Sequence, residues 1–175
     1  KDAYFSIFLD KHPKHMYEYL SDPNYRNAKA GLPEVYTTEQ IMQIKPTDKI
    51  NLKGSNFKII GYETISTEVT ASHYDMLPPE TFSVIFTGDG NKIALKAGNG
   101  KYVSADHSLN GKLIANRDQA GTWETFELIY LDDNKIALKA DNNKYVSIDP
   151  TDAANLVAGS DTISFAESFH IFINF

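Results

Sequence analysis

One stretch of the sequence recurs almost unchanged. Residues 91–106 read NKIALKAGNGKYVSAD and residues 134–149 read NKIALKADNNKYVSID, so thirteen of the sixteen letters agree. A diverged relative, DKINLKGSNFKIIGYE, occupies residues 48–63. Self-similarity at a period of about 20–50 residues indicates units that cannot bury their apolar faces alone and must pack together. We therefore divide the chain into segment one (48–87), segment two (91–131) and segment three (134–175).

Each segment contains four short stretches in which apolar and polar residues alternate, which is the period of a half-buried strand. In segment two these are KIALKA, KYVSAD, KLIANR and ETFELIY, and clusters of Gly, Asn and Asp separate them as tight hairpins require. The alternation puts three side chains of the last stretch on one face in each segment: Phe82, Val84 and Phe86; Phe126, Leu128 and Tyr130; Phe169, Ile171 and Ile173.

Three sets of four strands predict an all-β chain folded as a β-trefoil, with three repeats of about 43 residues. Such repeats close into a barrel, and closure removes most exposed sheet edges. We expect Phe82, Phe126 and Phe169 to meet near a common axis and to fill the floor of that barrel.

The pattern also resembles a known family. KIALKAGNGKYVSAD followed by LIANRDQAGTWETFELI is similar to the fascin-like β-trefoil domain, well over 91–173 and weakly over 48–87. The resemblance implies one of two roles. Fascins carry four tandem trefoils and bundle actin, whereas single fascin-like domains stand beside catalytic domains in secreted microbial glycan-degrading enzymes and look like carbohydrate-binding modules. Bundling needs two separated faces, so a single trefoil fits the second role better.

The first 47 residues do not match the repeat. They are predicted to be a partly helical N-terminal extension or the tail of an upstream domain, with a helix at 13–20 that begins at a proline. Thr37 and Gln40 have capping-box spacing, although 37–44 also alternates well enough to be a strand. His12 and His15 could hold zinc, but no third strong ligand is near in sequence, which favours an ordinary surface stretch and no metal site.

The composition limits the partners. A formal net charge of −6 argues against nucleic acid and anionic membranes, because a general polyanion binder presents a basic surface. The apolar runs fall far short of the roughly 20 residues that span a bilayer. The sequence contains no cysteine, which excludes disulfides, thiolate nucleophiles and cysteine zinc sites.

Segment two carries the best candidate for a binding site. Asn116 and Arg117 stand beside an aspartate in NRD, and amide, guanidinium and carboxylate groups form paired hydrogen bonds with sugar hydroxyls or with one another in turns. Asp106 and Asn110 lie in the polar loop ADHSLNGK, and Trp123 is the only tryptophan. An exposed indole stacks on the apolar face of a sugar ring; alternatively, Trp123 packs under the barrel. These five residues are the predicted carbohydrate site.

Glu80, Glu124 and Glu167 recur at the same place in the three segments. Paired carboxylates perform glycoside hydrolysis when they lie about 5–9 Å apart, but threefold symmetry separates these three around a barrel. We expect each to accept backbone N–H bonds in a turn. The sequence also shows no nucleophile with a base and no phosphate-binding glycine loop.

Taken together, the sequence predicts a non-catalytic, carbohydrate-binding β-trefoil module that needs no cofactor. Its partner would be a polysaccharide or oligosaccharide, and it would be an accessory to a secreted or cell-surface bacterial protein, with a catalytic domain in the same parent chain. One alternative is an actin-binding or protein-interaction module of the fascin type. Another is an enzyme with a pocket between 1–47 and the trefoil, lined by His12, His15 and Tyr17.

Overall fold

The computed structural model describes residues 44–88 and 90–174. The helix expected at 13–20, the capping box of Thr37 and Gln40, and the His12–His15 pair lie outside the described residues. The division of the chain at residue 47 stays a prediction. In the described ranges, no helix has both the length and the apolar character needed to cross a membrane.

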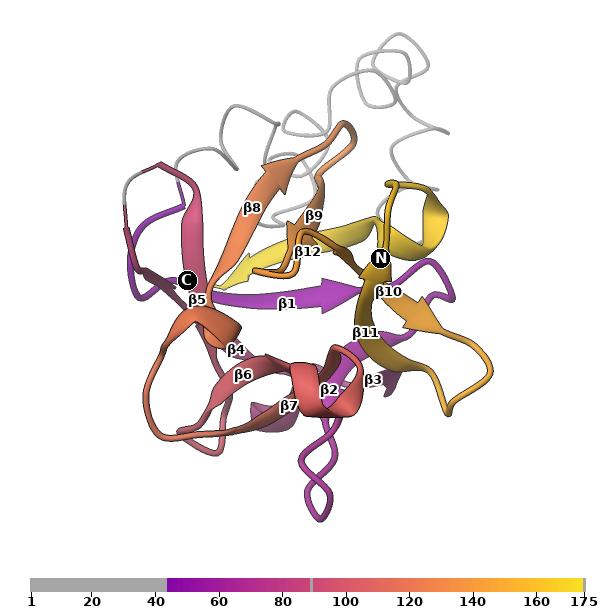
Figure 1. Cartoon of the computed structure of the whole chain (residues 1–175), viewed down its shortest axis with the longest axis horizontal. Coiled ribbons are helices and arrows are strands. Elements are labelled where there is room, and N and C mark those ends of the chain that lie inside the picture. The colour runs from indigo at the N-terminus through magenta and orange to yellow at the C-terminus, as the bar shows by residue number, and fades with distance from the viewer. Residues whose placement is uncertain (1–43, 89, 175) are drawn as a thin grey trace, which may run out of the picture. The chain divides into compact units, whose positions relative to one another are not determined.

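The described residues form twelve strands, four in each segment, joined by short 3-10 helices (Figure 1). The predicted all-β β-trefoil is confirmed. Segment one contains β1 (Lys49–Lys53), β2 (Ile59–Tyr62), β3 (Val69–His73), η1 (Pro78–Glu80) and β4 (Phe82–Phe86). Segment two contains β5 (Lys92–Lys96), β6 (Tyr102–Asp106), η2 (His107–Leu109), β7 (Lys112–Arg117), η3 (Thr122–Glu124) and β8 (Phe126–Tyr130). Segment three contains β9 (Lys135–Lys139), β10 (Tyr145–Asp149), β11 (Asn155–Ser160), η4 (Phe165–Glu167) and β12 (Phe169–Asn174).

Six strands close a barrel. β1 pairs with β12 and β4, β5 pairs with β4 and β8, and β9 pairs with β8 and β12, all antiparallel. The register repeats around the barrel, because an isoleucine stands opposite each of the three predicted phenylalanines: Ile50 opposite Phe82, Ile93 opposite Phe126, and Ile136 opposite Phe169. The six strands therefore leave no open edge between them.

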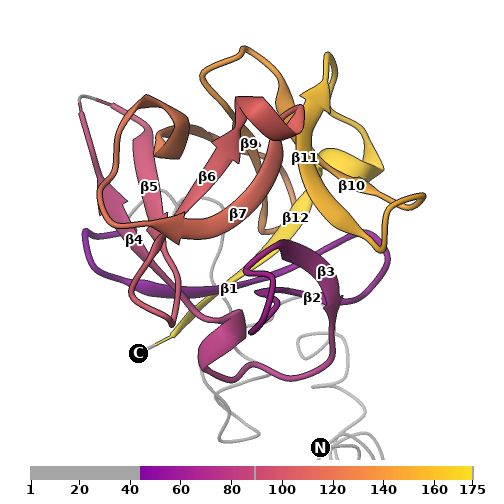
Figure 2. The same cartoon turned by 60° about the horizontal axis from the view of Figure 1, so that its bottom comes forward.

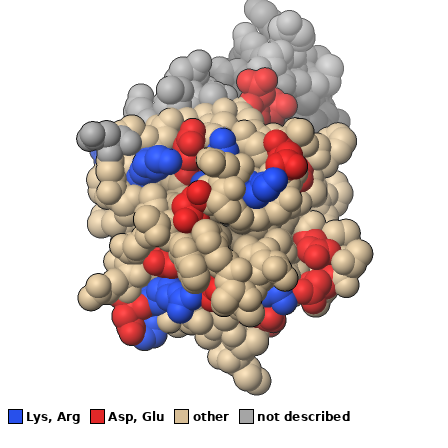
Figure 3. Space-filling model, viewed as in Figure 1, with Lys and Arg blue, Asp and Glu red and all other residues tan. Residues whose placement is uncertain are grey.

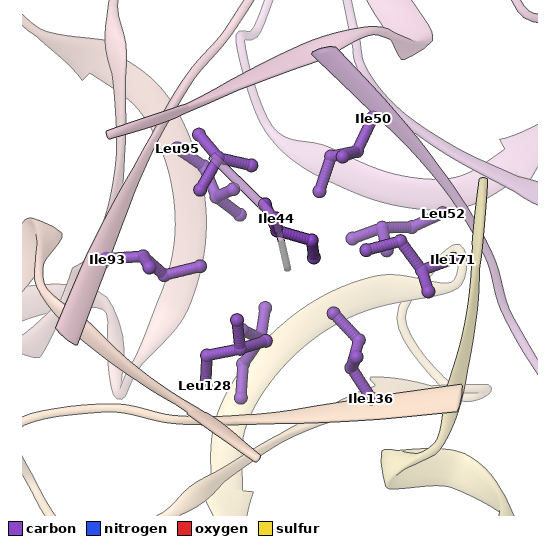
Figure 4. Close-up of a pocket in the computed structure, with 10 residues that line it drawn as sticks. Ile44, Ile50, Leu52, Ile93, Leu95, Leu128, Ile136 and Ile171 are labelled. Atoms are coloured by element: carbon purple, nitrogen blue, oxygen red, sulfur yellow. The ribbon is translucent and has the colours of Figure 1, made fainter. Parts of the chain in front are cut away.

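The barrel core has two layers of side chains. Phe82, Phe126 and Phe169 are each at most 1% exposed, as predicted. A second layer of aliphatic side chains lines the lumen, and Ile44 lies at its centre (Figure 4). Ile44 precedes segment one in the sequence, is 7% exposed, and leaves no room in the lumen for a water molecule. A residue from before the first repeat thus completes the core.

The other six strands form the hairpins β2–β3, β6–β7 and β10–β11, which come together at one end of the barrel (Figure 2). One backbone hydrogen bond of 2.8–2.9 Å links each segment to the next at this end of the barrel. The three bonds run from Ala71 N–H to Ala154 C=O, from Ala115 N–H to Thr67 C=O, and from Ala158 N–H to Gly111 C=O. Lys112 joins all three segments, since its Nζ lies 3.3 Å from Glu68 Oε1 and 2.9 Å from Asp152 Oδ2. These contacts fix the loops on which surface sites are built.

Asparagine holds the first hairpin turn of every segment. The Asn99 Nδ2 donates to the Ala115 carbonyl at 3.0 Å, and its Oδ1 accepts from the Lys101 N–H at 3.0 Å. Asn56 and Asn142 make the same two bonds in the other segments. Each asparagine therefore satisfies backbone groups that the turn would otherwise leave unpaired. On the face seen in Figure 3, several acidic and basic side chains lie next to one another.

Candidate functional site

The three recurring glutamates are structural. Each is the last residue of a 3-10 helix and is 5–6% exposed. Their carboxylates accept the backbone N–H three residues earlier: Glu80 from Leu77 at 2.8 Å, Glu124 from Gly121 at 2.9 Å, and Glu167 from Ser164 at 3.1 Å. The prediction that each glutamate accepts a backbone N–H bond in a turn is confirmed. The three carboxylates stabilise the turns that lead into β4, β8 and β12.

Asp106 and Arg117 are brought together at the side of the β6–β7 hairpin. Arg117 Nη2 donates to Asp106 Oδ2 at 2.8 Å, and Arg117 Nε lies 3.9 Å from Glu124 Oε2. Asp106 Oδ1 accepts from the Ser108 hydroxyl and from the Ser108 N–H at 2.9 Å. These hydrogen bonds and the Arg117 charge lower the pKa of Asp106, although burial acts to raise it. The guanidinium is therefore held between two carboxylates.

Trp123 lies beside this ion pair on η3. Its side chain is half-buried, so it does not pack fully under the barrel. Its ring stacks on His107 with centroids 4.6 Å apart and planes 25° apart, and the Arg117 guanidinium carbon lies 5.8 Å from the Trp123 ring centre. His107 Nε2 is 2.8 Å from Asp141 Oδ1 in the turn after β9. A link to segment three thus anchors one side of the tryptophan shelf, which we define as His107, Arg117 and Trp123.

The two predicted asparagines lie at opposite ends of β7. Asn116 occupies a β-bulge: Tyr102 pairs with Arg117 and Val103 pairs with Ala115, so Asn116 is left over and is exposed. A bulge turns its extra side chain out of the strand's regular alternation. Asn110 is also exposed and has a left-handed backbone with φ of 56°, where it ends η2. The structure therefore groups Asp106, Arg117 and Trp123, with Asn116 next to Arg117 in the chain and Asn110 at the hairpin end.

The equivalent position in segment one holds a histidine that we did not single out from the sequence. His73 Nδ1 lies 2.8 Å from Glu80 Oε1, and its Nε2 lies 3.2 Å from Glu63 Oε1. In segment three Ser160 takes this place. There, burial acts to raise the pKa of Glu167, but hydrogen bonds from Ser164 and Ser160 outweigh it and lower that pKa. Alignment of the three segments could have identified this position from the sequence, because His73, Arg117 and Ser160 each immediately follow the bulge residue of their segment.

The chemistry of the segment-two site is that of hydrogen bonding and stacking. It offers a fixed guanidinium, an exposed amide and part of an indole ring. Among the described residues, no group of three or more His, Asp or Glu side chains could hold a metal ion. Such a surface is suited to recognising a polar ligand that has one apolar face.

Comparison with known proteins places the chain in a family. The family model described as the FRG1-like domain matches residues 66–174, which is more than half of the sequence. The chain belongs to the FRG1-like domain family. This family is a β-trefoil family, in agreement with the fold that the sequence predicted. A comparison with curated protein sequences gives no match.

Solved structures share the fold at low sequence identity. The designed threefold-symmetric protein ThreeFoil is 18% identical, with a TM-score of 0.64 over 73% of this chain and 99% of that one. The Rhizoctonia solani agglutinin is 14% identical, with a TM-score of 0.60 over 75% of this chain and 98% of that one. The Polyporus squamosus lectin, solved with the human-type influenza-binding epitope Neu5Aca2-6Galb1-4GlcNAc, is 9% identical, with a TM-score of 0.62 over 74% of this chain and 50% of that one. Lectin folds thus recur among the chain's structural neighbours.

Proposed function

We propose that the FRG1-like trefoil is a non-catalytic carbohydrate-binding module, and that segment two carries its binding site. The observation that supports this most directly is the tryptophan shelf, in which an imidazole and a fixed guanidinium each lie within 6 Å of the ring centre of a half-buried indole. Sugars combine an apolar ring face with a rim of hydroxyls, and this shelf offers a group for each. The lectins among the structural neighbours provide the precedent at the level of the fold.

Each predicted residue has a separate role in this proposal. The exposed part of Trp123 covers the apolar face of one sugar ring, while the Arg117 fork and the Asn116 amide bond to its hydroxyls. Asp106 is 6% exposed and both of its oxygens are engaged within the chain, so it positions Arg117 instead of touching the sugar. Asn110, at the far end of β7, contacts a more distant unit of an oligosaccharide.

The setting of the module is also part of the proposal. We infer that it is an internally repeated trefoil that serves a secreted or cell-surface glycan-active protein, with a catalytic domain elsewhere in the parent chain. A single shallow site of this kind binds weakly, and attachment to a second binding or catalytic domain raises the effective concentration of the ligand.

A glycan array followed by titration calorimetry tests the proposal. Trp123→Ala and Asn116→Ala are expected to weaken binding of any glycan hit at least about fivefold, because stacking and hydrogen bonds each contribute on the order of 1 kcal/mol. Ser72→Ala is the matched control, since Ser72 is the bulge residue of segment one, opposite Ile59 and Ile60 as Asn116 is opposite Tyr102 and Val103. Absence of glycan binding above background at high protein concentration would remove the proposal.

A second candidate function, protein interaction of the fascin type, draws support from exposed apolar side chains at turns. Phe57 and Phe165 are each 83% exposed and Ile65 is 97% exposed, so these large apolar side chains are available to a protein partner. Co-sedimentation with actin filaments separates the two functions. Pelleting with filaments that Phe57→Ser or Phe165→Ser abolishes would favour protein interaction, and pelleting that neither variant changes would remove this support.

A further inference from the structure

An open groove of about 550 Å³, which was not predicted from the sequence, lies between segment one and the first hairpin turn of segment two. One wall is the loop that leads into η1, where Met76 and Leu77 are 46% and 58% exposed. The opposite wall is the hairpin turn after β5, and the two approach closely at Gly98 and Pro78. The volume lies within the range of about 300–1,000 Å³ that is usual for small-molecule sites. The lining residues are Lys49, Met76, Leu77, Pro78, Thr81, Ser83, Lys96, Ala97, Gly98 and Gly100.

A row of three outward-facing residues crosses the base of this groove. Ser83 on β4 pairs with Lys49 on β1 and with Lys96 on β5. Paired residues on adjacent antiparallel strands have Cβ atoms about 4.5–5.5 Å apart, so both ammonium groups can reach a ligand that lies over Ser83. Among the lining residues that the structure describes, the charged members are both lysines and none is a carboxylate.

The equivalent rows in the other segments differ at the middle position. In segment two Glu127 stands between Lys92 and Lys139, with Lys92 Nζ 3.9 Å from Glu127 Oε2. In segment three His170 stands between Lys135 and Lys53. Burial and the two neighbouring lysines lower the pKa of His170, in keeping with the positive charge on both sides of it. Serine in segment one leaves the two lysines without a counter-charge from the row.

The apolar wall also distinguishes segment one from segment two. Where segment one has Met76, Leu77 and Pro78, segment two has Ala120, Gly121 and Thr122 in the aligned sequence. Methionine and leucine side chains offer an apolar surface next to two positive charges, whereas alanine, glycine and threonine offer little. A ligand that fits the groove therefore combines a negative group with an uncharged body that has an apolar face.

We propose that this groove binds the negatively charged group of an acidic saccharide, with Lys49 and Lys96 holding the anion over Ser83 and the Met76–Leu77 wall covering the sugar ring. The assignment rests on the proposed carbohydrate-binding function and adds a ligand class and a second site to it. The anion is a carboxylate or a sulfate ester, because both present oxygen acceptors to ammonium donors. Lysine acts here as a point charge, so the interaction is screened by salt.

Titration of the full chain with three hexasaccharides tests the assignment. The probes are a hyaluronan hexasaccharide, which carries carboxylates, a chondroitin sulfate hexasaccharide, which adds sulfate esters, and a carboxyl-reduced, neutral hyaluronan hexasaccharide. The decisive variant is Ser83→Glu, which gives segment one the carboxylate that segment two has at Glu127 and which a strand of this barrel already tolerates. Ser83→Ala keeps the row uncharged, and Lys92→Ala removes the equivalent lysine of segment two as a control.

Binding of one or both acidic probes that Ser83→Glu weakens at least about fivefold, with Ser83→Ala and Lys92→Ala within about twofold of the wild type, supports the assignment. Tighter binding of one acidic probe identifies carboxylate or sulfate as the preferred group. Equal binding of the neutral probe, or no change in Ser83→Glu, overturns the groove assignment while leaving sugar binding at Trp123 in place. No binding of any of the three probes also overturns the groove assignment, whereas sugar binding at Trp123 is decided separately by the glycan array. Equally tight binding of a single-stranded oligonucleotide that Ser83→Glu abolishes would show a general anion site and refute the saccharide.

Discussion

Truncating Ile44, the side chain that fills the barrel lumen, tests whether a residue from before segment one stabilises the core. Ile44→Ala deletes three buried carbons, which at roughly 0.8 kcal/mol each corresponds to about 2.4 kcal/mol of lost transfer free energy. The lining residues belong to a closed ring of six strands and cannot collapse far into the gap, so a cavity adds to this loss. We expect the free energy of unfolding to fall by about 2–4 kcal/mol in total.

Urea unfolding followed by the fluorescence of Trp123, the single tryptophan, measures this change. With a urea m-value of about 2 kcal/mol/M, the midpoint should fall by about 1–2 M. Ile65→Ala is the matched control, because Ile65 is 97% exposed and its truncation should change the free energy by less than about 0.5 kcal/mol. Equal midpoints for the two variants would refute the claim that a residue from before segment one completes the core.

Three further predictions concern the Asn99 turn, the ionisation of Asp106 and the close packing of Gly98 against Pro78. Asn99→Ala should lower the free energy of unfolding by about 1–2 kcal/mol in a denaturant titration, because it leaves two backbone groups without partners. Acid unfolding should begin below about pH 4, because hydrogen bonds from Ser108 lower the folded-state pKa of Asp106. The contribution of Asp106 to stability is complete above its unfolded-state pKa of about 3.9, and it is lost as the pH falls through the folded-state pKa. Gly98→Ala should lower the thermal midpoint by several degrees, since a methyl group there would lie 2.2 Å from the Pro78 carbonyl oxygen.

Each of these predictions has an internal control. Gln119→Ala changes an exposed loop residue and should leave the denaturant midpoint in place, so an equal loss in both variants would contradict the role given to Asn99. Asp106→Asn should flatten the acid limb of a pH–stability curve, and an unchanged limb would show that other carboxyl groups govern it. Gly100 has a φ of 79° and open space around it, so Gly100→Asn should be milder than Gly98→Ala.

The barrel was predictable from the sequence because its signal is local and is repeated. Alternation in ETFSVIF, ETFELIY and ESFHIFI is enough to place Phe82, Phe126 and Phe169 inside, and the fixed offset of Glu80, Glu124 and Glu167 from them is enough to assign a turn role. Neither inference needs a contact between segments. For the same reason Asp106, Arg117 and Trp123 could be named together, since they follow one another within eighteen residues of segment two.

Features that depend on closure of the barrel could not be predicted. Ile44 fills a lumen built from all three segments, and the alternation of residues 37–44 does not indicate that this side chain enters it. The row of Lys49, Ser83 and Lys96 exists only because β4 lies between β1 and β5 with a particular register. The His107–Asp141 contact likewise joins two segments across 34 positions. Spacing along one chain does not report such neighbours.

The three bulges give this architecture an unusual freedom. Ser72, Asn116 and Gly159 are surplus to the strand ladders, so exchanging any of them alters the surface while the inter-strand hydrogen bonds stay as they are. A substitution at the bulge of one segment can therefore create a new contact with a partner while the fold of the other two segments stays unchanged. Ser72 places a hydroxyl at this position, Asn116 an amide, and Gly159 no side chain. The three segments therefore differ in surface chemistry although they share one strand arrangement.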